Sequence, residues 1–317
     1  MSLENATFVI NGTKLVYDNE TPFWFYVIVV GIPLLAGIAV VFNLVTLLVI
    51  YKFCGKIRSH YVLIVVQCSA DLLASFAYLM FYLTPSDIGM LLPLPYGIFY
   101  CTTRFFTNLI NASFAFSLMN TLAITLDRFV AVHSPLKYPS VARTSRMRII
   151  AAVMALISLI LACTPFFIAI TEENPANYPL CEIYYEVDTI IYQLVIGIIV
   201  LDTVVMIVVY SYILDKVRRR PVSQSNTGST YQTTVTSFWI VATFMVFYWP
   251  DIICGYLPIP YWSSLIVKSL ALVNCIADPL IYGIRLRKIK LGFRKFRSQL
   301  SNSSQTNTRS SKVDDKQ

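Results

Sequence analysis

The chain has 317 residues, of which 56% are hydrophobic and only 13% are charged, and its mean hydropathy is +0.65. A soluble protein of this length needs a larger charged surface, so the composition excludes an ordinary soluble globular domain. The formal net charge of +8 does not indicate nucleic-acid binding, because the basic residues are confined to short segments between long apolar blocks.

Seven apolar blocks follow one another along the chain, near 24–51, 60–84, 101–126, 148–170, 189–214, 236–256 and 262–284. About 20 apolar residues in a helix cross the hydrocarbon core of a bilayer. Each span must be helical, because backbone donors and acceptors find no water in lipid. The predicted fold class is an all-α membrane protein, with a seven-transmembrane helix bundle over residues 23–284.

The distribution of basic residues predicts how the chain is oriented in the membrane. All of the 25 Lys and Arg residues except Lys14, Arg104 and Lys268 follow the first, third, fifth or seventh block. Basic loops remain in the cytoplasm, which places the N-terminus outside and the C-terminus inside. No cleavable signal peptide is visible, so we expect the first span to target the chain to the membrane. The expected location is the plasma membrane.

The two termini are predicted to differ in character. Residues 1–22 form a polar extracellular tail in which Asn5, Asn11 and Asn19 each begin a glycosylation acceptor sequence. Residues 285–300 place apolar side chains on one helical face and basic side chains elsewhere, which favours an amphipathic helix on the lipids of the inner leaflet over a plain basic tail. Residues 301–317 are predicted to be disordered.

Several polar residues lie inside or at the ends of the spans, where they are energetically costly and need an explanation. The first two spans carry Asn43 and Asp71, and the third ends in the segment LDRFVAVHSPLKY, which contains Asp127 and Arg128. The last span ends in DPLIY, from Asp278 to Tyr282. In this order, these residues resemble the rhodopsin-like (class A) G-protein-coupled receptor family along the whole membrane domain, with the DRY motif at Arg128 and the NPxxY motif at DPLIY.

The resemblance implies an activation mechanism. Arg128, held at rest by Asp127, would move to meet a heterotrimeric G protein. Tyr210 and Tyr282 would stabilise the opened cytoplasmic cavity with their phenol groups. Pro250 removes a backbone donor from the sixth span, and the resulting kink would let the inner half of that helix move outward.

The resemblance also implies two structural sites. Asp71, Ser117, Asn274 and Asp278 fall where family members build an ion pocket. Two neighbouring carboxylates cannot both stay charged cheaply without a cation, so this pocket holds either a sodium ion, at Asp71 and Asp278, or a shared proton. No other cofactor is expected. Cys101 and Cys181 are the two cysteines placed to form the disulfide usual in the family.

Some positions depart from the family pattern. Ala155 replaces the usual Trp of the fourth span, Asp202 the usual Pro of the fifth, and Tyr248 the usual Trp of the sixth. Thr230 stands where many members carry an acid that pairs with the motif Arg, so raised basal activity is expected. These departures place the chain in a divergent branch that resembles orphan and chemosensory receptors as well as divergent peptide receptors.

The ligand pocket is expected between the outer halves of the helices. Ile110, flanked by Asn111, occupies the position where amine receptors carry Asp, which argues against a biogenic-amine ligand. Leu272 occupies the position of the retinal-binding Lys, which argues against an opsin. Asp251 and Lys268 either form a mutual salt bridge or contact the ligand directly. The pocket residues predicted are Arg104, Ile110, Asn111, Tyr248, Asp251 and Lys268.

The sequence thus predicts a receptor that transduces the binding of an extracellular small molecule, odorant or peptide into G-protein activation. Serine and threonine residues after position 297 are candidates for phosphorylation that recruits arrestin. The alternative is a transporter or ion-coupled carrier that uses the buried acids and Lys268. An enzyme is not expected, because motifs such as HExxH and GxSxG are absent from the sequence.

Overall fold

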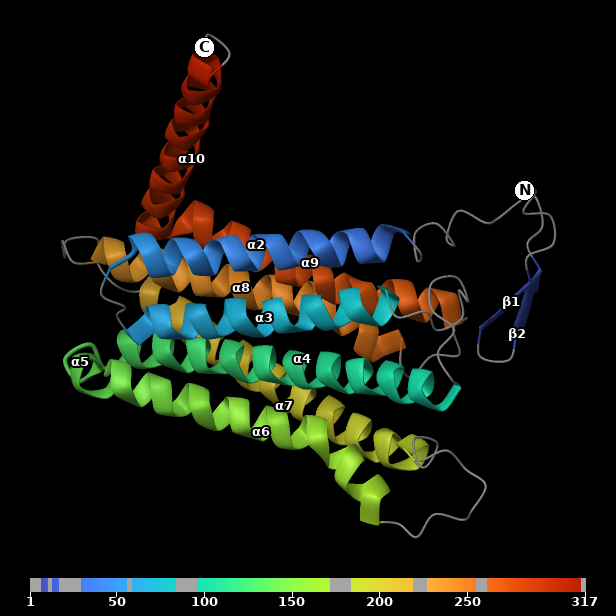
Figure 1. Ribbon diagram of the computed structural model, residues 1–317. Helices are drawn as coiled ribbons and strands as arrows, with labels where there is room; N and C mark the ends of the chain where they lie inside the picture. Colours follow the sequence, from blue (N-terminus) through green and yellow to red (C-terminus); the bar gives the residue numbers. More distant parts are fainter. Residues whose placement is uncertain are drawn as a thin grey trace.

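The computed structural model describes residues 7–10, 13–16, 30–55, 59–83, 96–171, 184–218, 227–254 and 261–314. Long helices run side by side along one direction in this part of the chain (Figure 1). They are α2 (Ile32–Phe53), α3 (Ser59–Leu83), α4 (Tyr96–His133), α6 (Thr144–Thr171), α7 (Tyr184–Arg218), α8 (Thr227–Cys254) and α9 (Tyr261–Arg285). A short helix, α5 (Tyr138–Val141), follows α4.

Six of the described helices are long and apolar enough to cross a membrane. The spans are Ile32–Phe53, Tyr61–Leu83, Phe105–His133, Ile196–Lys216, Thr233–Cys254 and Ile266–Arg285. Helix α6 has 28 residues and lies alongside them, but most of its side chains beyond Ile160 lie outside the described part. The structure therefore confirms an all-helical membrane domain with six clear apolar spans.

The third helix extends further than its hydropathy predicts. The apolar block was expected to end near residue 126, whereas α4 continues to His133. The helix does not stop at Asp127 and Arg128 because the two side chains are buried and bonded to each other, so they do not need bulk water.

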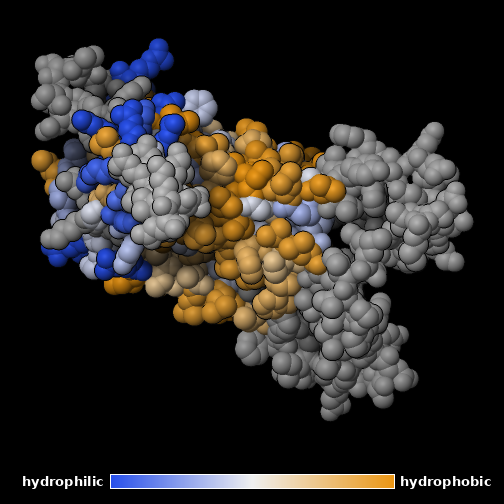
Figure 2. Space-filling model, turned by 45° about the horizontal axis from the view of Figure 1, so that its top comes forward, coloured by the Kyte–Doolittle hydropathy of each residue, from blue (hydrophilic) through white to orange (hydrophobic). Residues whose placement is uncertain are grey.

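Apolar side chains cover the outside of the bundle and polar side chains fill part of its inside. Leu201, Val246 and Ile149 are more than half exposed, whereas Asn43 and Asp71 are completely buried. Figure 2 shows hydrophobic residues along the middle of the molecule and hydrophilic residues gathered at one end. This arrangement suits a lipid environment, because an apolar outer surface costs nothing there and polar groups must be satisfied internally.

Small residues allow close contact in the middle of the bundle. Ala39 on α2, Ala74 on α3 and Cys275 on α9 form one fully buried cluster. Small side chains let helix backbones approach closely, which favours van der Waals packing where lipid removes the hydrophobic driving force. A larger apolar cluster joins α4, α7 and α8 through Leu118, Met206 and Phe244.

The N-terminal tail contains a β-hairpin that the sequence analysis did not predict. Strand β1 (Thr7–Ile10) pairs antiparallel with β2 (Thr13–Val16). The strands are rich in β-branched residues, and the sequence Asn-Gly between them favours a tight turn. The glycosylation positions Asn5, Asn11 and Asn19 lie outside the described residues.

The C-terminal helix α10 (Arg287–Asp314) leaves the bundle at the end where α5 lies and points away from its long axis (Figure 1). Leu286 and Ile289 are buried against Ile50, Tyr61 and Tyr282. Disorder was predicted from residue 301, but the structure continues the helix to Asp314. The sequence of α10 contains no proline to remove a backbone donor, so no residue interrupts the hydrogen-bond ladder.

Candidate functional site

A buried ion pair lies at the α5 end of α4. The Arg128 guanidinium forms a salt bridge with the Asp127 carboxylate, and its Nε donates to Asp127 Oδ2 at 3.1 Å. Both residues are buried, with 5% and 7% of their surface exposed. The predicted pairing is confirmed. Burying a guanidinium is costly unless a carboxylate compensates it, so each residue depends on the other.

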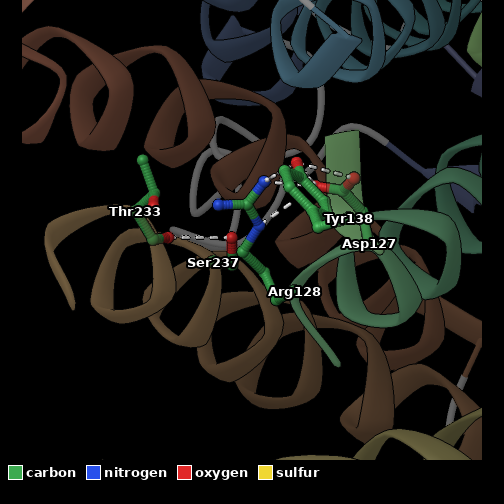
Figure 3. Close-up of polar contacts among 5 residues, drawn as sticks. All are labelled: Asp127, Arg128, Tyr138, Thr233 and Ser237. Carbon is green, nitrogen blue, oxygen red and sulfur yellow. Dashed lines mark hydrogen bonds and ion pairs between the residues drawn. The ribbon is translucent and has the colours of Figure 1, made fainter. Parts of the chain in front are cut away.

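Tyr138, the first residue of α5, completes this pair. Its hydroxyl donates to Asp127 Oδ1 at 3.1 Å and accepts from Arg128 Nη2 at 3.1 Å. Figure 3 shows the tyrosine ring beside both side chains, with Thr233 and Ser237 of α8 on the other side of Arg128. The sequence analysis did not assign a role to Tyr138, although it ends the LKY segment that follows the Asp-Arg motif. We call Asp127, Arg128 and Tyr138 the arginine cluster.

A narrow cavity of about 30 Å³ lies against the arginine cluster. Asp127 and Arg128 line it together with Tyr282 of α9 and with Thr233 and Ser237 of α8. The volume holds about one water molecule and cannot admit a segment of another protein. Among the described residues, the helix ends around Arg128 are therefore closed to a partner protein in this structure.

Helix α8 presents hydroxyl groups rather than a carboxylate to this cavity. Its sequence has no Asp or Glu before Asp251. Thr233, Thr236 and Ser237 line the cavity instead, and Ser237 Oγ donates to the Thr233 carbonyl at 3.0 Å. The side chain of Thr230 lies outside the described part, but the sequence shows that this half of α8 contributes no acid to pair with Arg128.

The two tyrosines predicted to act in activation are both buried. Tyr282 is completely enclosed, and Tyr210 is 4% exposed. Neither phenol oxygen has a hydrogen-bond partner among the described atoms. Pro250 lies inside α8, which continues to Cys254. The structure places these residues as expected, and their roles in activation stay predictions.

A polar network joins α3 and α4 in the middle of the bundle. Ser117 Oγ donates to Asp71 Oδ1 at 3.2 Å, and Gln67 donates to both residues. Asn120 Nδ2 donates to Gln67 Oε1 at 2.8 Å and to the Leu63 carbonyl at 2.9 Å. The sequence analysis predicted Asp71 and Ser117 but missed Gln67 and Asn120. Their signal was present, because both are amides inside apolar spans, one helical turn from a predicted residue.

Asn274 and Asp278 of α9 bring further polar atoms to this level. Both are buried, and none of their side-chain oxygens has a partner in the described part of the chain. The second carboxylate oxygen of Asp71 also has none. Asn43 donates to the Cys275 carbonyl at 2.8 Å and so ties α2 to α9. An oxygen-rich set with two carboxylates has the chemistry to hold a hard cation or a shared proton.

Comparison with known families identifies the chain. The sequence profile of the family described as "7 transmembrane receptor (rhodopsin family)" matches residues 42–282, which is more than half of the chain. The chain belongs to this family. Among curated proteins, no sequence matches it significantly. The matched segment contains the arginine cluster and the central polar network.

The predicted ligand residues of this rhodopsin-family receptor fall in different environments. Ile110 is buried in a cluster with Tyr78 and Leu272, and Tyr248 stacks on Phe244 with ring centroids 4.2 Å apart. Asn111, in contrast, is exposed on α4, and its place in the ligand pocket stays a prediction.

Asn108 on the same helix is buried, and its amide nitrogen has no partner among the described atoms. It faces the interior and was missed by the sequence analysis. The side chains of Cys101 and Arg104 lie outside the described part, as does all of Cys181, so the disulfide stays a prediction.

The salt bridge expected between Asp251 and Lys268 is not formed. No nitrogen–oxygen contact within 4.0 Å joins these two described side chains. Lys268 is exposed, and only its backbone carbonyl is bonded, by the Tyr78 hydroxyl at 3.1 Å. Direct contact of either side chain with a ligand stays a prediction.

The polar network predicts a stability change. Replacing Asn120 by Ala removes the two hydrogen bonds to Gln67 and Leu63 and leaves both acceptors buried. We expect the free energy of unfolding to fall by about 1–2 kcal/mol. Thermal or detergent-induced unfolding of the purified receptor measures this change. Asn111→Ala, the same substitution at an exposed site on α4, should cost less than about 0.5 kcal/mol. Equal effects of the two variants would contradict the importance of the network.

Proposed function

We propose that the receptor couples the binding of an extracellular small molecule, odorant or peptide to the activation of a heterotrimeric G protein. The observation that carries this proposal is the buried arginine cluster at a closed end of the bundle. A guanidinium there is held by an adjacent carboxylate and one phenol, and it becomes available to a partner protein only if the neighbouring helix ends separate.

The closure of this end supports such a movement. Apolar and hydroxyl side chains of α8 line the cavity beside Arg128, and the sequence of α8 supplies no carboxylate to pair with it. Separating these contacts therefore breaks no ion pair between α4 and α8 in the described part of the chain. A conformational equilibrium with a gap of a few kcal/mol lets a ligand shift the population toward the open form.

The proposed topology has seven spans, with α6 as the fourth, and α10 as an eighth helix on the inner leaflet. The N-terminus is extracellular, and the protein resides in the plasma membrane. The support is the basic sequence around α10 and the burial of Leu286 and Ile289, which hold the start of α10 against the bundle. Phosphorylation of the Ser- and Thr-rich C-terminal segment would recruit arrestin.

The central polar residues are proposed to hold a sodium ion in the resting receptor. Asp71 and Asp278 would supply the carboxylates, with Ser117 and Asn274 beside them. The ion would neutralise the charge of two buried acids. The unpartnered oxygens of Asp71, Asn274 and Asp278 support this assignment, and a proton shared between the acids is the alternative.

The transporter hypothesis receives less support. The matched family consists of receptors, which are not typically enzymes or carriers. Moreover, Asp251 and Lys268, which a charge relay would use, are not paired.

One prediction of the proposed function concerns Arg128. We expect the receptor to stimulate nucleotide exchange on at least one G protein without ligand, because α8 offers no acid to lock Arg128. Arg128→Ala should abolish this basal signal at matched surface expression. Arg148→Ala, which removes an exposed Arg on α6, should leave it unchanged. A basal signal that persists in Arg128→Ala would count against the proposed mechanism.

The second prediction concerns Tyr138. Tyr138→Phe keeps the ring but removes the hydroxyl that bonds Asp127 and Arg128. Losing about 1 kcal/mol from the closed form should raise basal signalling roughly fivefold. Tyr51→Phe, at an exposed position on α2, serves as the matched control in the same assay. Unchanged or reduced signalling in Tyr138→Phe would show that the hydroxyl does not stabilise the closed form.

The third prediction concerns sodium. Replacing sodium by an organic cation at constant ionic strength should raise basal signalling, because the resting form loses its bound ion. Asp71→Asn removes one carboxylate and should make signalling insensitive to the exchange of cations. If signalling instead depends on pH and not on sodium, the shared proton is the correct assignment.

A further inference from the structure

A histidine, a tyrosine and a lysine join the ends of α4 and α7. His133 is the last residue of α4, and its Nδ1 lies 2.7 Å from the hydroxyl oxygen of Tyr212 on α7. Lys216, one turn after Tyr212, donates from Nζ to the same oxygen at 3.2 Å and to the His133 carbonyl at 3.3 Å. We call these three residues the α4–α7 latch.

Aromatic contacts hold the side chains of the latch in place. Phe129, one turn before His133, stacks on the imidazole with ring centroids 5.2 Å apart, and its centroid lies 5.4 Å from that of Tyr212. Lys216 Nζ lies 5.6 Å from the centroid of the Tyr212 ring. Phe129 also packs against the apolar cluster that joins α4, α7 and α8. The imidazole is therefore connected by direct packing to the interior of the bundle.

The hydrogen-bond donors of the latch indicate the protonation state of His133. An ammonium group has only donors, so the Tyr212 oxygen accepts from Lys216. The described atoms offer the Tyr212 hydroxyl proton one acceptor, His133 Nδ1, which accepts only when it carries no proton. A phenol whose oxygen accepts from a cation is also a stronger donor. The latch therefore fits a neutral imidazole with its proton on Nε2.

The charged groups around the latch are mainly basic. Neither His133 nor Lys216 forms an ion pair in the described part of the chain. Asp127 and Arg128 of α4 are bonded to each other and to Tyr138. Helix α8 has no charged residue before Asp251, although it carries the phenol of Tyr231. The other charged residues on neighbouring elements are Asp215 and Arg218 on α7, Lys137 before α5, and Arg143, Arg146 and Arg148 around the start of α6.

A proton on His133 would break the latch. Nδ1 would change from an acceptor to a donor, so the Tyr212 hydroxyl would lose the atom to which it donates. The imidazolium would also lie beside the Lys216 ammonium, and like charges repel. Histidine is the side chain whose charge ordinarily changes between about pH 5 and about pH 8. His133 is exposed, so protons reach it from the solvent.

We propose that the α4–α7 latch is a proton-operated switch, in which neutral His133 holds the end of α7 against α4 and protonated His133 releases it. The structure contains the latch together with the closed arginine cluster, so the latch stabilises the closed form. In the proposed topology this end of the bundle is cytoplasmic, and acidification of the cytosol would shift the receptor toward its open form. This consequence rests on the proposed function, whereas the switch itself does not.

NMR of the histidine ring nitrogens in the purified full-length receptor tests the switch directly. His60 is the only other histidine in the sequence, so His60→Asn leaves the signals of His133 alone. We expect Nδ1 of His133 to be unprotonated at about pH 7.5 and protonated at about pH 6.0. In Tyr212→Phe, neutral His133 should become a mixture of its two tautomers. A protonated Nδ1 at the higher pH, an unprotonated Nδ1 at the lower pH, or a single tautomer in Tyr212→Phe would each overturn the proposal.

Nucleotide exchange on a purified G protein tests the consequence for signalling. From about pH 7.5 to about pH 6.0, basal exchange should rise roughly fivefold once the exchange without receptor is subtracted. His133→Asn places an amide oxygen near the position of Nδ1, so it keeps the acceptor but takes up no proton. Exchange by this variant should stay low at both pH values. His133→Phe keeps a stacked ring without an acceptor, and its exchange should be high at both.

The control for these variants is His60→Asn, which removes the other histidine and should leave the response to pH unchanged. A response to pH that persists in both His133→Asn and His133→Phe would show that another group is the sensor and would overturn the proposal. Absence of exchange in every variant would contradict the proposed function, and the NMR titration would then decide the switch on its own.

Discussion

The lipid around this bundle offers no hydrogen-bond partners, so the polar groups of its spans must be bonded within the protein or by water and ions enclosed in it. The side-chain nitrogen of Asn43 meets this requirement by donating to a carbonyl of α9, and that of Asn120 by donating to a carbonyl of α3, whereas the amide oxygens of both lack a partner among the described atoms. Each bond fixes the rotation and height of one helix against another. The small residues Ala39 and Ala74 then allow the backbones to approach. A few interhelical amide bonds and the close packing of small residues thus act together to hold the helices in place.

Two parts of the bundle contain buried polar groups that have no hydrogen-bond partner or depend on very few. Near the middle, the carboxylate of Asp278 and the amide of Asn274 lack partners among the described atoms. Nearer the closed end, the phenol of Tyr282 lacks one, while Arg128 relies on Asp127 and Tyr138. Unsatisfied buried polar groups destabilise the form that contains them. These groups are therefore the places where an enclosed ion, a proton or a rearrangement of the helices would change the stability of the closed form most.

The start of α10 packs against the bundle near the membrane boundary. Tyr282 packs in one cluster with Leu286 and Ile289, which hold the start of α10 against the bundle. Gly292 follows one turn later and brings α10 onto α2. The start of α10 and the buried tyrosine are therefore connected by continuous side-chain packing.

Sequence alone determined the features that depend on composition or on neighbouring residues. Long apolar blocks located the helices, and adjacency in the chain ensured that Asp127 would pair with Arg128. Tertiary structure decided the rest, because it depends on how each helix is rotated against its neighbours. It alone showed that Tyr138 joins the ion pair, that Gln67 and Asn120 link α3 to α4, and that Asn111 faces outward. It also left Asp251 and Lys268 unpaired, since whether two distant side chains meet is set by helix rotation and not by their charges.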